Sequence, residues 1–113
     1  MLTIRRQADV VPLLGPGIAL LKVGRGLFAL VDVECYPVLV RYHWRLHKSA
    51  GCYYAYRRHI SNGRCVQVLL HNHILSPTPG MQVHHINGFT LDNRRTNLCY
   101  LTPTEHRAVH GIL

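Results

Sequence analysis

The chain has 113 residues, enough for one compact domain or for two small subdomains that share a core. Apolar residues make up 48% of it, which excludes wholesale disorder, and no apolar run reaches the ~20 residues of a membrane helix. The apolar stretch 10–21 follows Arg5 and Arg6, but prolines and glycines break it and no small-x-small cleavage site follows. We therefore expect a cytoplasmic protein rather than a secreted one.

The charge is strongly positive and unevenly distributed. Thirteen Lys and Arg against five Asp and Glu give a net charge of +8, and no acidic residue occurs from Cys35 to Leu91. An unmixed basic segment indicates a polyanionic partner. Because this segment contains no basic amphipathic helix of the kind that lies on lipid, we expect nucleic acid and no membrane. The four cysteines form no C-x-x-C pair, so we expect buried apolar cysteines rather than a zinc knuckle.

The first two thirds of the chain predict mostly strands. A strand over residues 24–33 is followed by a short helix over 34–43, with Glu34 in its first turn. A meander of three strands follows, over residues 44–48, 52–59 and 65–70. Asn62-Gly63 is the strongest short hairpin signal in the chain. After a helical turn at 71–75, Pro77, Pro79 and Gly80 mark the expected boundary between regions 1–80 and 81–113.

The last region predicts the order strand, loop, strand, helix. The strands are expected over residues 82–86 and 97–101, with Asn87-Gly88 turning the chain between them. Thr102 is the expected N-cap of the helix, Pro103 its first residue and Glu105 the partner in a capping box. This helix should extend to about His110. The predicted class is α+β.

Histidines at this end of the chain have metal-ligand spacing. His106 and His110 are four residues apart, so both project from one helical face and can share a metal ion. His84 and His85 are neighbours in a strand and face opposite ways, so only one of them should bind the same ion. A neutral imidazole beside such a site is suited to take a proton from water. A purely structural zinc site is the alternative, but that usually has four protein ligands.

Several segments of this region together match a known pattern. They are residues 83–88 (VHHING) and 91–95 (LDNRR), then Asn97-Leu98, Leu101-Thr102, Glu105-His106 and His110. In residue types and spacing they resemble the HNH endonucleases with the ββα-metal motif, and most of all the phage and intron-encoded homing or nicking branch. The resemblance implies a nuclease that leaves 5′-phosphate and 3′-hydroxyl ends.

The resemblance also implies a role for each matching residue. His85 matches the general base, and Asn97 matches the middle letter of HNH, whose amide ties down the loop. His84 and His106 match metal ligands, and His110 matches the extra ligand of His-rich members. The cofactor implied is one divalent ion, Mg²⁺, Mn²⁺, Zn²⁺, Ni²⁺ or Co²⁺. Three imidazoles suit a transition metal better than Mg²⁺.

The segment 28–80 resembles, more loosely, the AP2 type of DNA-binding sheet that precedes the motif in many phage relatives. A three-stranded sheet can present one face to the major groove of double-stranded DNA. The candidate DNA-binding residues of the sheet are Arg45, Lys48, Arg57, Arg58 and Arg64. With period 2, Arg57 lies on one face and Arg58 on the other, so not all of them reach DNA. Arg94 and Arg95, beside the catalytic loop, are candidates for a phosphate clamp.

Two hypotheses follow for the function. The first is a metal-dependent DNA endonuclease that nicks one strand per active site, with His85 as base and a His-bound metal at the leaving group. The second is a sequence-reading DNA-binding protein whose metal site is structural or degenerate. Only three residues follow His110, so we expect modest site specificity in a monomer, or a homodimer for double-strand cuts. We also expect Trp44 to lie in the core.

Overall fold

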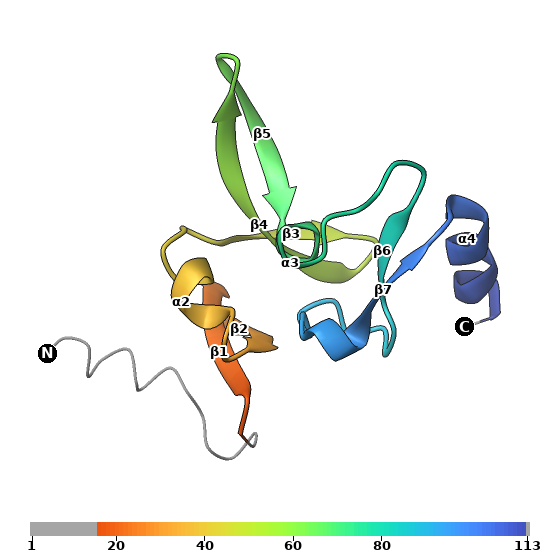
Figure 1. The fold of residues 1–113 in the computed structure, drawn as a ribbon, viewed down its shortest axis with the longest axis horizontal. Helices are drawn as coiled ribbons and strands as arrows, with labels where there is room; N and C mark the ends of the chain where they lie inside the picture. The colour runs from red at the N-terminus through yellow and green to blue at the C-terminus, as the bar shows by residue number, and fades with distance from the viewer. Residues whose placement is uncertain (1–15, 113) are drawn as a thin grey trace, which may run out of the picture.

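Figure 1 shows the computed structural model, which describes residues 16–112 and the side chains of residues 16–109. The elements in chain order are β1 (Ile18–Gly24), β2 (Leu27–Asp32), α2 (Tyr36–Leu39), β3 (Arg45–Ser49), β4 (Cys52–Ser61), β5 (Arg64–Leu69), α3 (Leu70–Ile74), β6 (Gln82–His85), the 3-10 helix η2 (Arg95–Asn97), β7 (Leu98–Leu101) and α4 (Pro103–Ile112). The strands form three antiparallel sheets, β1-β2, β3-β4-β5 and β6-β7. The described helices include none of the length and apolarity that crossing a membrane requires.

Two-residue turns join the strands of the first two sheets. Arg25-Gly26, Ala50-Gly51 and Asn62-Gly63 all have positive φ at both positions, the type I′ geometry that matches the twist of the strands. The prediction of a hairpin at Asn62-Gly63 is confirmed. The strand expected over residues 24–33 begins later, at Leu27, because Arg25 and Gly26 form a turn. That turn joins β2 to β1, a strand the sequence did not predict.

The short helix α2 is smaller than expected. It covers Tyr36–Leu39 rather than residues 34–43, and Glu34 lies before its first turn. The helix ends early because the carbonyl of Leu39 accepts hydrogen bonds from the Tyr42 backbone N–H and from the Trp44 indole. The indole bond is 2.8 Å long and Trp44 is 4% exposed, so the prediction that Trp44 lies in the core is confirmed.

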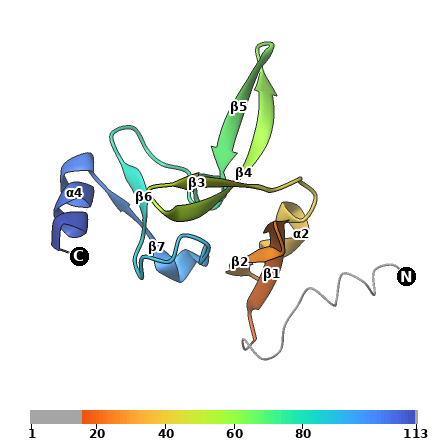
Figure 2. The same ribbon diagram turned by 180° about the vertical axis from the view of Figure 1, so that it is seen from behind.

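The core lies between the β1-β2 hairpin, α2 and the inner face of the second sheet. Its buried members are Ala19, Leu21, Val23, Ala29, Val31, Tyr36, Leu39, Trp44, Ala55, Leu70 and Leu91. Leu70 anchors α3 in this core, and Leu91 comes from the loop after β6. Figures 1 and 2 show the β4-β5 hairpin projecting beyond this body, with α4 and the β1-β2 hairpin at opposite ends of the molecule.

The cysteine prediction was wrong. Cys35, Cys52 and Cys99 are half-buried and Cys65 is exposed, and all four are free thiols. Cys65 lies in β5 near the tip of the hairpin that projects from the rest of the described structure in Figure 1, so this small apolar side chain remains in solvent.

The loop after β6 is fixed to the edge of β2. Leu30 donates its backbone N–H to the Leu91 carbonyl at 2.8 Å, and Asn93 donates its N–H to the Leu30 carbonyl at 2.8 Å. The backbone N–H of Arg95 donates to the Asp32 carboxylate at 2.9 Å. These bonds make a short parallel bridge between the first hairpin and the C-terminal motif. The two regions therefore meet through backbone hydrogen bonds as well as through Leu91.

The C-terminal strands and helix form a ββα unit. β6 pairs with β7 so that His84 lies opposite Cys99 and His85 opposite Leu98. The capping box of α4 is confirmed: the Glu105 N–H donates to Thr102 Oγ1 at 3.1 Å, and the Thr102 N–H donates to Glu105 Oε1 at 2.8 Å. The second strand begins at Leu98 rather than Asn97, because Asn97 closes a 3-10 turn through its N–H bond to the Arg94 carbonyl.

The contact of Leu91 with the core predicts a large effect from one substitution. Leu91→Ala should lower the free energy of unfolding by about 2 to 5 kcal/mol, because it leaves a cavity where the loop meets the β1-β2 hairpin. Phe89→Ala is the matched control, since Phe89 is in the same loop but 51% exposed. Urea denaturation measures both. Equal losses for the two variants would contradict the packing described here.

Candidate active site

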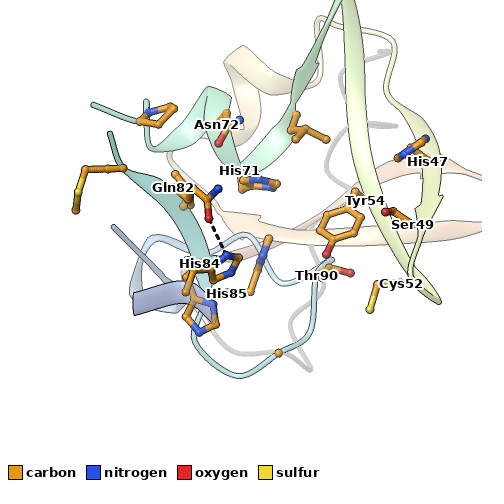
Figure 3. A pocket seen from close by; sticks show the side chains of 16 residues that line it. His47, Ser49, Cys52, Tyr54, His71, Asn72, Gln82, His84, His85 and Thr90 are labelled. Carbon is orange, nitrogen blue, oxygen red and sulfur yellow. Dashed lines mark hydrogen bonds between the residues drawn. The ribbon is translucent and has the colours of Figure 1, made fainter. Parts of the chain in front are cut away.

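A cavity of about 530 Å³ lies between the second sheet and the ββα unit. Side chains from β3, β4, α3, β6 and α4 line it, and Figure 3 shows several of them pointing into one space. The histidines among them are His47, His71, His84, His85 and His106. His71, His84 and His85 are each at most 8% exposed. Imidazoles from distant parts of the sequence thus converge on one cavity.

His85 is held through one ring nitrogen. Its Nε2 lies 3.0 Å from Oδ1 of Asn93, and Asn93 is 1% exposed. The other end of the Asn93 amide, Nδ2, donates to the carbonyl of Thr90 at 3.4 Å, which directs Oδ1 at the histidine. An amide oxygen only accepts, so Nε2 carries the proton and donates it. The lone pair of the neutral ring is then on Nδ1.

Burial lowers the pKa of His85 below its usual value. The hydrogen bond that His85 donates to Asn93 and the charge of Asp92 raise this pKa, and the charge of His106 lowers it further. The net result is a ring that is neutral at physiological pH. A neutral ring with a free Nδ1 lone pair is the state that a general base requires.

His84 and His106 form the second histidine group. Their ring centroids are 5.2 Å apart. Nδ1 of His106 lies 2.8 Å from Oε1 of Gln82, so Nδ1 is the protonated nitrogen and Nε2 has the lone pair. The side chain of His110, expected as a further ligand, lies outside the described residues. Among the side chains that the structure does describe, no group of three or more His, Cys, Asp or Glu has metal-binding geometry.

The loop between β6 and β7 is closed by a polar network around Asn97. Its side chain accepts from the Asn87 N–H at 2.9 Å and donates to the Asn87 amide oxygen at 2.9 Å and to the Asp92 carbonyl at 2.8 Å. Asn87 also donates to the Asp92 carboxylate. Asn97 is 5% exposed, so its amide holds the loop and does not face the cavity solvent.

Arg94 and Arg95 have different surroundings. Arg94 donates to both carboxylate oxygens of Asp92, at 2.8 and 2.7 Å. Burial alone would raise the pKa of Asp92, but the hydrogen bonds from Arg94 and Asn87 outweigh it and lower that pKa. The Arg95 side chain is 57% exposed and 3.8 Å from an exposed Glu34, a pair of little energetic weight. Arg94 therefore closes the loop, and Arg95 is the arginine open to solvent.

The strand register divides the basic residues of the second sheet between two faces. Arg45 pairs with Tyr56, His47 with Tyr54 and Arg58 with Gln67, so these side chains share the face that lines the cavity. Lys48, Arg57 and Arg64 are on the other face. There, Arg57 stacks on Tyr42 with 4.4 Å to the ring centroid and donates to His73 Nδ1 at 3.1 Å.

Sequence reasoning missed three side chains of this site, Gln82, Asn93 and Tyr54, and it had considered His71 only for a contact with phosphate or the catalytic loop. Asn93 lies inside the LDNRR segment that matches the HNH pattern. Its contact with His85 could not be predicted, because that contact depends on the backbone hydrogen bond that holds Asn93 to β2. Tyr54 and His71 come from the second sheet and α3. Gln82 had a local signal, since residues two apart in a strand share a face and His84 was already a candidate.

Comparison with known proteins gives one match. Residues 76–108 match the family model of the HNH endonucleases. No curated protein and no solved structure matches the chain. The match includes β6, η2 and β7 and most of α4, and with them Gln82, His84, His85, Asn93, Asn97 and His106. It supports a nuclease domain, and so a hydrolase that acts on DNA, at the C-terminal end of the chain.

The burial of His71 makes stability depend on pH. Burial, together with the nearby His85, lowers the pKa of His71 from 6.5 to about 4. Between these values the unfolded chain takes up a proton that the folded chain does not, so stability falls as the pH falls through this range. The loss from this residue is about 3 kcal/mol when the pH is below both values.

His71→Phe removes this titration and keeps a ring in place. Urea denaturation from pH 7 to pH 4 should show a smaller loss of stability for the variant than for the wild type. A wild type and a variant with parallel pH profiles would contradict a buried neutral His71.

Proposed function

We propose that the protein is a metal-dependent DNA endonuclease that nicks one strand per active site, with His85 as the general base. The observation that carries the proposal is the His85–Asn93 bond at 3.0 Å, which leaves Nδ1 of a buried neutral imidazole as a proton acceptor at the cavity. The family match over the same residues supports the reaction class. His85 takes a proton from a water molecule, and the resulting hydroxide attacks the scissile phosphate.

In this proposal a divalent metal ion binds beside the base. His84 and His106 would hold it, with the Gln82 hydrogen bond fixing the tautomer of His106 as such bonds do for ligating histidines. When bound, the ion supplies charge neutralisation at the phosphate and at the departing 3′ oxygen. Two imidazoles leave positions for substrate and water, and in our proposal His110 adds a third ligand. Nitrogen donors favour a transition metal over Mg²⁺.

DNA would approach along the cavity face of the second sheet. Arg45 and Arg58 lie on this face and are exposed, and Arg95 is exposed beside the catalytic loop. The acid-free segment from Cys35 to Leu91 contains both sheet arginines, so nothing acidic in it repels the phosphates. Lys48 and Arg64 face the other way and are expected to contribute less.

Removal of the base tests the catalytic part of the proposal. With supercoiled plasmid and Mn²⁺ or Mg²⁺, His85→Ala should nick at least about 100 times more slowly than the wild type, with DNA affinity retained. His43→Ala removes an exposed histidine that does not line the cavity and is the control. If the wild type binds DNA after metal chelation but nicks it with none of the metals, the protein is a DNA-binding protein and the nuclease proposal is wrong.

Calorimetric titration tests the metal. We expect Mn²⁺ or Zn²⁺ to bind more tightly than Mg²⁺, and His84→Ala and His106→Ala to weaken that binding. Gln82→Leu removes only the bond to His106 and should weaken it about 10- to 100-fold. Tighter binding of Mg²⁺, or full affinity in Gln82→Leu, would count against this ligand set.

Charge removal on the two sheet faces tests the DNA path with matched variants. The Arg45→Ala/Arg58→Ala pair should weaken DNA binding and reduce the slope of log K against log salt by about 0.9 for each lost phosphate contact. Lys48→Ala/Arg64→Ala removes the same charge from the opposite face and should leave the slope nearly unchanged. Equal changes in both pairs would mean that only net charge matters.

A further inference from the structure

We propose that Tyr54 and His71 are positioning residues that hold the ring of His85 so that Nδ1 points into the cavity. The value of this for catalysis rests on the proposed function, whereas the positioning of the ring does not. Both residues lie outside the segment 76–108 that matches the HNH endonucleases, so the family match does not assign them a role.

The contact between the three rings is direct. The centroid of His71 is 4.8 Å from that of His85, with the ring planes at 79°. Tyr54 is 6.3 Å from His85 and 6.1 Å from His71, with planes at 61° in both pairs. These are edge-to-face pairs within the range where aromatic rings attract each other. Figure 3 shows the three side chains together at the cavity wall.

A second restraint is needed because a hydrogen bond at Nε2 fixes only one atom of the His85 ring. The ring can still tilt about the line from Cβ to Nε2, and this tilt changes the direction in which Nδ1 points. Rings packed at an angle oppose that tilt. In active sites a displacement of about 1 Å can cost on the order of 100-fold in rate.

The two positioning residues are themselves held by regular structure. Tyr54 lies in β4, the central strand of its sheet, opposite His47 of β3. His71 follows Leu70, a fully buried residue of the core, in α3. The two rings are therefore anchored in the core of the first two thirds of the chain, whereas His85 and its partner Asn93 come from the segment 76–108.

His71 acts through its ring and not through a charge. Burial keeps its pKa near 4, so it is neutral at the pH where the base works. A charged neighbour 4.8 Å away would repel the proton that His85 must accept. A phenylalanine at position 71 should therefore replace the positioning function, whereas alanine should not.

Two measurements on the full chain test the proposal. In single-turnover nicking of plasmid, His71→Ala and Tyr54→Leu should lower the maximal rate about 10- to 100-fold with little change in the DNA concentration at half-maximal rate. His71→Phe and Tyr54→Phe should restore most of that rate. His73→Ala is the control, because it removes a histidine ring from α3 that does not line the cavity.

The second measurement needs no activity. In NMR spectra without DNA or metal, the ring protons of His85 should have shifts displaced by the neighbouring rings in the wild type and in His71→Phe. In His71→Ala, where only the Tyr54 ring remains, the shifts should be closer to those of a free histidine. Thermal unfolding identifies variants that do not fold. If an alanine or leucine variant does not fold, the corresponding phenylalanine variant is used to test the proposal. Unchanged His85 shifts and rates in His71→Ala, or a His71→Phe as slow as His71→Ala, would overturn the proposal. A wild type that never nicks but has displaced shifts would refute the nuclease and leave the positioning intact.

Discussion

Asn93 is the residue on which the candidate site depends. Its backbone N–H is bound to β2, its Nδ2 is bound to the Thr90 carbonyl, and its buried Oδ1 is thereby presented to His85. A buried amide in this position has one favourable orientation, because the reversed amide would place its oxygen against a carbonyl and its NH₂ against the protonated ring nitrogen. The proton on Nε2 of His85 follows from that orientation, and the lowered pKa that burial gives the ring leaves Nδ1 able to accept a proton.

The site combines parts of the chain that the sequence order keeps separate. His85, the proposed base, and the candidate metal ligands come from the ββα unit, whereas the rings packed against His85 come from β4 and α3. The loop that carries Asn93 is joined to the β1-β2 hairpin by backbone hydrogen bonds. The stability of the fold and the geometry of the candidate site are therefore coupled. Loss of packing at Leu91 or at Leu70 displaces residues that contact His85, although neither leucine lines the cavity.

The parts of the fold with local signals were predictable. Asn62-Gly63 requires only its own backbone geometry, and the capping box of Thr102 and Glu105 needs only residues within one turn. β1 was not predicted, because Arg25-Gly26 is an unusual pair for a type I′ turn and prolines and glycines precede the strand. The extent of α2 depends on Trp44, which takes a carbonyl that a longer helix would need.

The same distinction holds for the site. Residue type and spacing, which can be read directly from the sequence, identified the candidates His84, His85, Asn97 and His106. Asn93, Tyr54 and His71 act on His85 only because the tertiary fold brings them to it. The register of β3, β4 and β5 likewise decides which arginines share the cavity face, and period 2 alone had separated only Arg57 from Arg58.

Long-range ¹H–¹⁵N NMR of the His85 ring at neutral pH tests the central claim most directly, because it reports which ring nitrogen carries the proton. The account predicts a neutral ring protonated at Nε2, with an unprotonated Nδ1, and loss of this preference in Asn93→Ala. A ring protonated at Nδ1, or one that is charged at neutral pH, would contradict it.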